Sequence, residues 1–125
     1  MIVGVGLDLA DVARLGALRR RWGERLLRRV YTDAELEACL GRGDADDALA
    51  ARFAAKEAAM KALGTGWSGG VTWRDVEVVS RRGTAPTLRL TGEAAALAAR
   101  LGVQGVHLSL SHDKGVAAAV VILEA

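Results

Sequence analysis

Residues 51–66 set the strongest limit on how this chain can fold. They read ARFAAKEAAMKALGTG and predict a helix that ends at Leu63, because Gly64 suits the left-handed conformation that terminates helices. The buried face of this helix is marked by Leu49, Phe53, Met60 and Leu63. Lys56 falls on the same face, where a lysine is expected only if an anionic group lies beside it.

Glu57 and Lys61 lie at positions i and i+4 of this helix, so their side chains are neighbours. One interpretation is an ordinary surface ion pair worth ~0.3–0.5 kcal/mol. We favour a functional site, because short alanines surround the two charges and leave the helix backbone accessible. The segment Gly64-Thr65-Gly66 follows directly, and glycine-rich backbone beside lysines is typical of a phosphate-binding loop.

The remaining patterns predict an α+β fold in which a mainly antiparallel sheet packs with helices, in a single domain over residues 1–125. A helical pattern from Asp11 to Val30 is expected to break at Gly23, and Thr32 forms a capping box with Glu35 for the next helix, through residue 40. Further elements are expected at 2–7 (strand), 46–63 (helix, capped by Asp46 or Asp47), 71–80 and 87–91 (strands), 93–101 (helix), and 106–111 and 116–123 (hairpin strands around a turn at 112–115).

The composition narrows the class of protein. With 125 residues, 51% of them hydrophobic, the chain can bury one core but has little material for a wide cleft, so a large ligand is expected to bind between subunits. No apolar run approaches the ~20 residues of a membrane span, and the N-terminal residues lack the basic start of a signal peptide. The only cysteine, Cys39, is expected to fill the core, which suits a reducing cytoplasm.

Positive charge is concentrated in one segment, although the net charge is only +2. Seven arginines lie within sixteen residues, accompanied by Glu24 alone: Arg14, Arg19, Arg20, Arg21, Arg25, Arg28 and Arg29. Such a segment indicates an acidic partner. Aromatic residues make up 4% of the chain, too few for the stacking that single-stranded nucleic acid binding favours.

Asp8 follows the first predicted strand. An acid at this position is equally typical of a helix N-cap and of a functional carboxylate. A Mg2+ site needs only one or two carboxylates, with waters and phosphate oxygens as the other ligands. Asp8 and Glu57 would form such a site if the end of the strand meets the helix.

The segment from His107 to His112 is a predicted strand that leads into a turn. Alternation places Leu108 and Leu110 inward, and places His107, Ser109 and Ser111 on the opposite face. No Gly-x-Ser-x-Gly nucleophile motif occurs, and two histidines without a cysteine cluster do not make a zinc site. By itself this strand therefore indicates no particular chemistry.

Together these features resemble one family over essentially the whole chain. Gly6-Leu7-Asp8, the run from Arg52 to Gly66 with its Lys-Glu-Ala-x-x-Lys core, and Ser109-Leu110-Ser111-His112 resemble the signatures of holo-acyl-carrier-protein synthases. These are the small type of 4′-phosphopantetheinyl transferase. The resemblance implies a Mg2+-dependent enzyme of fatty acid biosynthesis that transfers 4′-phosphopantetheine from coenzyme A to a serine of apo-acyl carrier protein. It also implies a homotrimer with active sites between subunits.

The resemblance assigns roles residue by residue. Asp8 and Glu57 match the family's metal ligands, and Lys61 matches its catalytic lysine, which neutralises the phosphate as 3′,5′-ADP leaves. The positions that match coenzyme A contacts are Arg52, Lys56, Gly64, Thr65, Gly66, Ser109, Ser111 and His112. The positions expected to dock the acidic carrier protein are Arg14, Arg21 and Arg25.

The residues fit this chemistry, because phosphoryl transfer depends on positioning and charge neutralisation more than on covalent catalysis. The proton of the carrier serine could go to Asp8, to Glu57 or to a metal-bound water. The turn Gly83-Thr84-Ala85-Pro86 has one residue more than the family pattern, so Pro86 is not included among the expected adenine contacts.

Two alternatives stay open at this point. The same transfer could serve carriers of polyketide or peptide synthesis. The arginine-rich segment could instead belong to a non-enzymatic basic module that binds nucleic acid or carrier protein, with Arg14, Arg21, Arg25 and Arg28 on one stripe if the helix is continuous. That second alternative leaves Lys56, Glu57 and the glycine loop without a role.

Overall fold

The computed structural model describes residues 1–64 and 69–125. The helices are α1 (Val12–Trp22), α2 (Glu24–Val30), α3 (Asp33–Leu40), α4 (Ala45–Leu63) and α5 (Gly92–Arg100), with a short 3-10 helix, η1, at Trp73–Asp75. The strands are β1 (Ile2–Asp11), β2 (Val76–Val79), β3 (Thr87–Leu90), β4 (Gly105–Asp113) and β5 (Val116–Glu124). The strand pairings in this part of the chain are antiparallel, which confirms the predicted α+β class.

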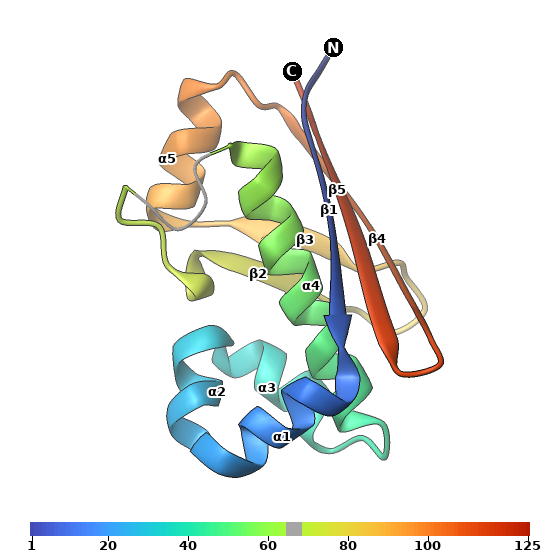
Figure 1. Ribbon diagram of the computed structural model, residues 1–125. Coiled ribbons are helices and arrows are strands. Elements are labelled where there is room, and N and C mark those ends of the chain that lie inside the picture. The colour runs from blue at the N-terminus through green and yellow to red at the C-terminus, as the bar shows by residue number, and fades with distance from the viewer. Residues whose placement is uncertain (65–68) are drawn as a thin grey trace.

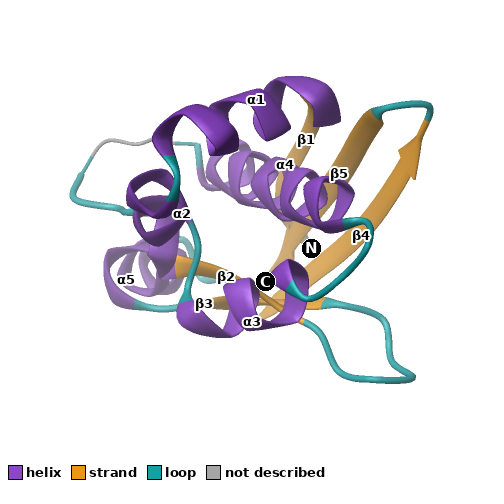
Figure 2. Ribbon diagram, turned by 90° about the horizontal axis from the view of Figure 1, so that it is seen from below, coloured by secondary structure: helices purple, strands orange, loops and turns teal. Residues whose placement is uncertain are grey.

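The long strands form one sheet in the order β1-β5-β4, and β2 and β3 form a second, two-stranded sheet. Helix α4 runs beside the three-stranded sheet, and α1, α2 and α3 gather near its N-terminal end (Figure 1). Viewed from below, α1 and α3 lie on different sides of α4 (Figure 2). Helix α4 is therefore the element around which the others pack.

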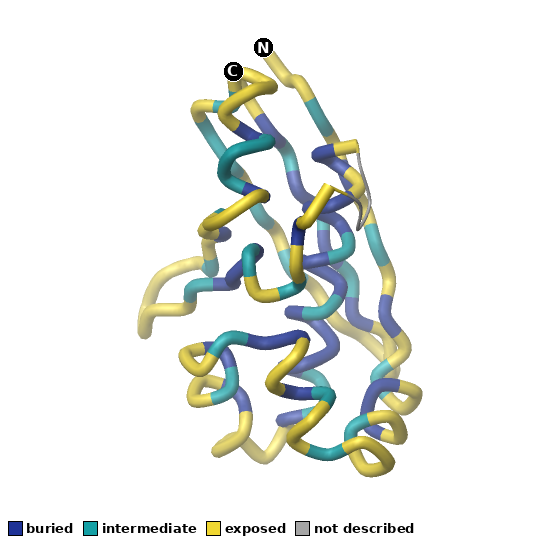
Figure 3. Tube along the Cα trace, turned by 90° about the vertical axis from the view of Figure 1, so that its left-hand side faces the viewer, coloured by how far each residue is buried: buried dark blue, intermediate teal, exposed yellow. Residues whose placement is uncertain are grey.

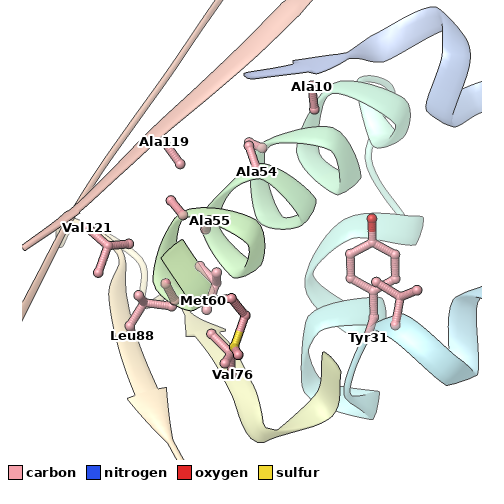
Figure 4. Packing of buried hydrophobic residues seen from close by; sticks show 14 of the residues in the cluster. Ala10, Tyr31, Ala54, Ala55, Met60, Val76, Leu88, Ala119 and Val121 are labelled. Atoms are coloured by element: carbon pink, nitrogen blue, oxygen red, sulfur yellow. The ribbon is translucent and has the colours of Figure 1, made fainter. Parts of the chain in front are cut away.

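Helix α4 is buried along most of its length, as the dark blue stretch through the middle of the molecule shows (Figure 3). Its alanines let the strands approach closely: Ala54 and Ala55 lie among side chains of the sheet, while Met60 lies near Val76 (Figure 4). The buried face is thus wider than the predicted stripe, on which Phe53 is only half-buried. Cys39 is fully buried, as expected of a core residue.

Two glycines bring β1 into contact with the backbone of α4. A Cβ atom on Gly6 would lie 1.8 Å from the carbonyl oxygen of Ala58, and one on Gly4 would lie 2.2 Å from that of Ala62. Both distances are far inside van der Waals contact, so only glycine fits at this crossing. The close approach places Asp8, two residues after Gly6 on the same face of β1, against α4.

We expect Gly6→Ala to lower the free energy of unfolding by about 1–3 kcal/mol or more, because overpacking forces the backbone to shift. Gly43→Ala is the matched control, since a Cβ atom on Gly43 meets nothing within 4 Å. Urea unfolding of the two variants measures the difference. Equal stability of Gly6→Ala and wild type would show that β1 and α4 are not held together at Gly6.

Strand β1 is longer than the predicted strand 2–7, because it pairs with β5 as far as Asp11 opposite Val116. Asp8 therefore lies inside the strand and does not cap a helix. The N-cap of α1 is Asp11, whose side chain accepts a hydrogen bond of 3.1 Å from the backbone N–H of Arg14.

Other local predictions are confirmed or corrected by the structure. Gly23, with φ 60°, separates α1 from α2, Thr32 and Glu35 form the capping box, and Gly64, with φ 85°, ends α4. The N-cap of α4 is Asp44 instead of Asp46 or Asp47, because the helix already begins at Ala45 and includes both of them in its first turn. Asp46 forms an ion pair of 2.8 Å with Arg19.

The predicted strand 71–80 is shorter, because a capping box between Thr72 and Asp75 forms η1 before β2 begins. At the hairpin, His112 belongs to β4, and Lys114 and Gly115 make the turn, both with positive φ. None of the helices in residues 1–64 and 69–125 combines the length and hydropathy that a transmembrane span requires.

Candidate active site

Three of the predicted site residues line one cavity of about 400 Å³. Asp8 comes from the inner face of β1, and Glu57 and Lys61 come from consecutive turns of α4. Arg14 and Leu18 of α1 line the same cavity. The structure thus brings together the residues that the sequence assigned to metal binding and catalysis.

Lys61 is bonded to Asp8 across this cavity. Its Nζ donates to Asp8 Oδ1 at 2.9 Å and to the backbone oxygen of Leu7 at 3.1 Å. The Asp8 side chain is mostly buried, whereas 55% of the Lys61 side chain is exposed. The hydrogen bond and the charge of Asp8 raise the pKa of Lys61, and the charge of Glu57 adds to this effect. Lys61 therefore stays positively charged at neutral pH.

The oxygen atoms in this cavity suit a hard cation. Asp8 and Glu57 offer carboxylates from two different elements, and Mg2+ commonly takes one or two carboxylates plus waters and phosphate oxygens. In the part of the chain that the structure describes, no three His, Cys, Asp or Glu side chains gather as a metal site. The donor set therefore fits Mg2+ bound jointly with a phosphate ligand.

A second cavity, of about 230 Å³, contains Arg52. Arg52 is buried; its guanidinium donates to the oxygen of Ala48 at 3.2 Å and to Ser80 Oγ at 2.8 Å. Its buried Nε has no hydrogen-bond partner among the described residues. A buried cationic donor without a partner is costly in the free protein, so this cavity is suited to an anionic ligand.

The rim of the second cavity carries further charges. Arg42 binds Asp44 through two hydrogen bonds, Nε to Oδ1 at 2.8 Å and Nη2 to Oδ2 at 2.9 Å, and both residues line the cavity. Ser111, His112 and Pro86 line it as well. The longer turn therefore does not carry Pro86 away from Arg52.

The two cavities open on different sides of α4. Residues nine positions apart, such as Ala48 in the second cavity and Glu57 in the first, are separated by about 180° on a helix with 3.6 residues per turn. Arg52 and Glu57 are separated by about 140°. The helix itself thus stands between the two groups of site residues within one subunit.

Lys56 requires a correction. It was expected to contact coenzyme A, but its ammonium is fully buried and binds Glu35 Oε1 at 2.7 Å, the oxygen of Trp73 at 3.1 Å and the oxygen of Val76. These partners use all three of its N–H donors. Burial lowers the pKa of Lys56, and the charge of Glu35 opposes this shift. The anionic neighbour predicted from the sequence is therefore Glu35, and Lys56 has a structural role.

The remaining predicted ligand contacts lie at several places. Gly64 is exposed at the end of α4, whereas Thr65 and Gly66 lie outside the described residues. In β4, Ser109 is exposed on the outer face of the sheet, paired with Val120, as alternation predicted. Ser111 and His112, at the end of β4, are the two that reach the second cavity.

Gly23 divides the arginine-rich segment between two helices, as the sequence predicted. Arg14 and Arg21 belong to α1, and the guanidinium carbon of Arg21 lies 5.1 Å from the centre of the Trp22 ring. Arg25 belongs to α2 and lines a separate hollow with Trp22. The predicted break is therefore confirmed, and the condition for one stripe through Arg28, a continuous helix, is not met.

Sequence reasoning missed several residues near the two cavities. Phe53 lines the first cavity and stacks on Trp73, with ring centres 5.0 Å apart. Arg42 and Asp44 line the second cavity, but in the sequence they are only two opposite charges in a predicted loop, which does not indicate a site. The capping box of α3 by itself accounted for a glutamate at position 35, so the sequence did not indicate that Glu35 also pairs with Lys56.

Comparisons with known proteins agree with this arrangement. Residues 4–121 match the family model of the 4′-phosphopantetheinyl transferase superfamily. A holo-[acyl-carrier-protein] synthase of Koribacter versatilis is 50% identical over 124 residues, covering 99% of each chain. The crystal structure of the synthase from Neisseria meningitidis covers 100% of both chains at 31% identity, with a TM-score of 0.90.

A further similar structure carries a ligand. It is a holo-(acyl-carrier-protein) synthase from Bacillus anthracis in complex with coenzyme A (3′,5′-ADP), 34% identical, covering 98% of this chain and 96% of that one, with a TM-score of 0.79. Similarity over the full length, in sequence and in fold, leads to one assignment. The chain belongs to the holo-[acyl-carrier-protein] synthases of the 4′-phosphopantetheinyl transferase superfamily.

Proposed function

We propose that this chain catalyses Mg2+-dependent transfer of 4′-phosphopantetheine from coenzyme A to a serine of apo-acyl carrier protein, in support of fatty acid biosynthesis. The observation that carries the proposal is the gathering of Asp8, Glu57 and Lys61 in one cavity. The names of the relatives and the coenzyme A bound to the similar Bacillus anthracis structure support the substrate.

The reaction forms one P–O bond and breaks another. The carrier serine oxygen attacks the phosphorus that bears the pantetheine arm, and the bond to the second phosphate breaks, so that 3′,5′-ADP leaves with the electron pair. When bound by Asp8 and Glu57, Mg2+ would supply positive charge to the pyrophosphate. The Lys61 ammonium adds a donor where negative charge grows. Asp8 or Glu57 could accept the serine proton.

The second cavity is proposed to hold the nucleotide of coenzyme A. The buried, partnerless Nε of Arg52 and the neighbouring Ser111 and His112 are suited to an anionic, polar ligand. Because α4 separates this cavity from Asp8 and Glu57 in one subunit, we propose that one coenzyme A molecule uses the metal ligands of one subunit and the Arg52 cavity of its neighbour.

The exposed face of the three-stranded sheet supports assembly into a homotrimer. Val5, Leu7 and Leu9 of β1 are 57%, 61% and 65% exposed, and they pair with Ile122, Val120 and Ala118 of β5 on the same face. A contiguous apolar face of this kind is typical of a subunit interface. Further copies of the chain are its proposed occupants, and light scattering after gel filtration would give the subunit number.

We also propose that residues 1–125 act as one domain in the cytoplasm. One cluster of buried residues includes side chains from α1 to α5 and from β1 and β5, and partly buried residues of β4 pack against it. The single cysteine is buried and free, which suits a reducing compartment.

Mg2+ and coenzyme A together should stabilise the protein more than the sum of either alone, because the metal and the pyrophosphate complete each other's coordination. A ligand at a hundred times its Kd stabilises by about 2.7 kcal/mol, which a thermal shift assay detects. Glu57→Gln should abolish the metal-dependent part. Glu37→Gln, on the exposed side of α3, is the matched control.

Equal stabilisation of Glu57→Gln and wild type would remove Glu57 from the metal site. The transfer itself is tested by the mass gain of apo-carriers incubated with the protein, coenzyme A and Mg2+. A panel with fatty acid, polyketide and peptide carriers identifies the acceptor. Binding of a carrier without any mass gain would favour the non-enzymatic module.

The carrier is proposed to dock along α1. Arg14 and Leu18 line the cavity of Asp8, and the exposed side chain of Trp22 lies one helical turn beyond Leu18 on α1. At low salt, Arg14→Glu should raise KM for the carrier about tenfold or more, while KM for coenzyme A stays nearly constant. Arg100→Glu, an equal charge change on α5, is the control. A wild-type KM in Arg14→Glu would place the docking surface elsewhere.

A further inference from the structure

We propose that Lys61 is a resident counter-ion of Asp8 and that Mg2+ displaces it, so that metal binding itself releases Lys61 to the phosphate. The inference rests on the proposed function and adds an exchange step to it. Its basis is that Lys61 Nζ lies 2.9 Å from Asp8 Oδ1, one of the two oxygens through which Asp8 would coordinate a metal.

The two cations compete for the same carboxylate. An ammonium at hydrogen-bond distance from Asp8 Oδ1 occupies the approach to that oxygen, and it repels a second cation brought to the same place. The Asp8 side chain is only 17% exposed, so solvent screens this repulsion little and offers few other directions of approach. Mg2+ bound at Asp8 is therefore expected to displace the Lys61 ammonium from this hydrogen bond.

Lys61 is free to move, in contrast to the other lysine of the same helix. Lys56 is fully buried, and three acceptors hold its ammonium. Lys61 has a side chain that is 55% exposed, and its ammonium donates to Asp8 and to the backbone oxygen of Leu7, both of which belong to β1. Lys61 can therefore leave Asp8 by rotating its side chain, without any change in the core.

The exchange couples the metal to the phosphate ligand. Without a phosphate, Mg2+ must break the Lys61–Asp8 pair, and the ammonium loses this hydrogen bond without gaining a phosphate oxygen. With a pyrophosphate present, the released ammonium gains phosphate oxygens, so the two ligands assist each other's binding by the same factor. Lys61 then stands beside the reacting phosphate only after the metal has bound.

Metal binding in the absence of coenzyme A tests the exchange. Manganese(II), followed by electron paramagnetic resonance, should bind roughly tenfold more tightly to Lys61→Met than to wild type, because the competing cation is gone. Arg14→Met removes the same formal charge from the same cavity and should change the affinity by less than about threefold. The exchange would be overturned if Lys61→Met bound manganese(II) with the affinity of wild type. It would also be overturned if Lys61→Met and Arg14→Met gained the same affinity for manganese(II).

A second measurement follows Lys61 directly in the wild-type protein. The chain has three lysines, Lys56, Lys61 and Lys114, so 13C-labelled lysine gives three Cε signals. Addition of Mg2+ should shift the Lys61 signal and leave the other two in place. If the chemical shift of the Lys61 signal does not change when the protein is saturated with metal, the proposal is wrong. Failure of wild type to bind manganese(II) even with coenzyme A would instead contradict the proposed metal site.

Discussion

Replacing Lys61 by alanine is expected to lower kcat for phosphopantetheine transfer by about 10²–10³-fold, with little change in KM for coenzyme A. The ammonium lies in the cavity of Asp8 and Glu57, where the proposed reaction would place the growing negative charge of the leaving phosphate. An interaction that strengthens only as this charge develops stabilises the transition state more than the bound substrate. Steady-state kinetics with varied coenzyme A separates the two effects.

Lys114→Asn serves as the control for Lys61→Ala. Lys114 is an exposed lysine at the hairpin turn, with a φ of 49°, which asparagine also adopts. The kcat of the Lys114→Asn variant should equal that of wild type. If Lys61→Ala raises KM while kcat stays constant, Lys61 binds the substrate and does not act in the transition state.

Replacing Lys56 by methionine should lower the free energy of unfolding by about 3–5 kcal/mol. The change leaves the carboxylate of Glu35 buried without its counter-ion, and it removes the hydrogen bonds from Lys56 to the backbone oxygens of Trp73 and Val76. Removing one partner of a fully buried pair costs more than replacing both, because the remaining charge keeps its desolvation penalty. Guanidinium unfolding measures the loss.

The double variant Glu35→Gln/Lys56→Met separates the unpaired charge from lost packing. It should recover part of the stability lost by Lys56→Met, and a double-mutant cycle with Glu35→Gln gives the coupling between the two side chains. A loss below about 1 kcal/mol in Lys56→Met would contradict a structural role for the pair. KM for coenzyme A should not change at temperatures where the variant is folded.

The sequence predicted those elements whose signals are local. Thr32 and Glu35 form their capping box within one turn of helix, and Gly64 ends α4 through its own backbone conformation. The extent of β1 was underestimated, because its last residues are strand only through pairing with β5. Pairing between segments more than a hundred residues apart leaves no mark in the sequence of either one.

The site could be predicted in part for the same reason. Glu57 and Lys61 are neighbours by helix geometry alone. Asp8 was a candidate partner of Glu57 by its chemistry, and resemblance to the family supported the pairing. Resemblance also assigned Arg52, Ser111 and His112 to one ligand, but the cavity that they line could not be predicted from the residues, because it joins the start of α4 to the ends of β2 and β4. The unpartnered Nε of Arg52 becomes visible only when every neighbouring acceptor has been placed.

The two lysines of α4 show most plainly what the sequence determined and what the tertiary structure decided. The sequence by itself determined that Lys56 and Lys61 occupy different sides of one helix, and that Lys56 needs an anion, because apolar residues share its face. Only the tertiary structure decided that Glu35 of α3 is that anion and that β1 brings Asp8 to Lys61. The physical reason is that a side chain's charge is tolerated or used according to what surrounds it, and its surroundings come from distant segments of the chain.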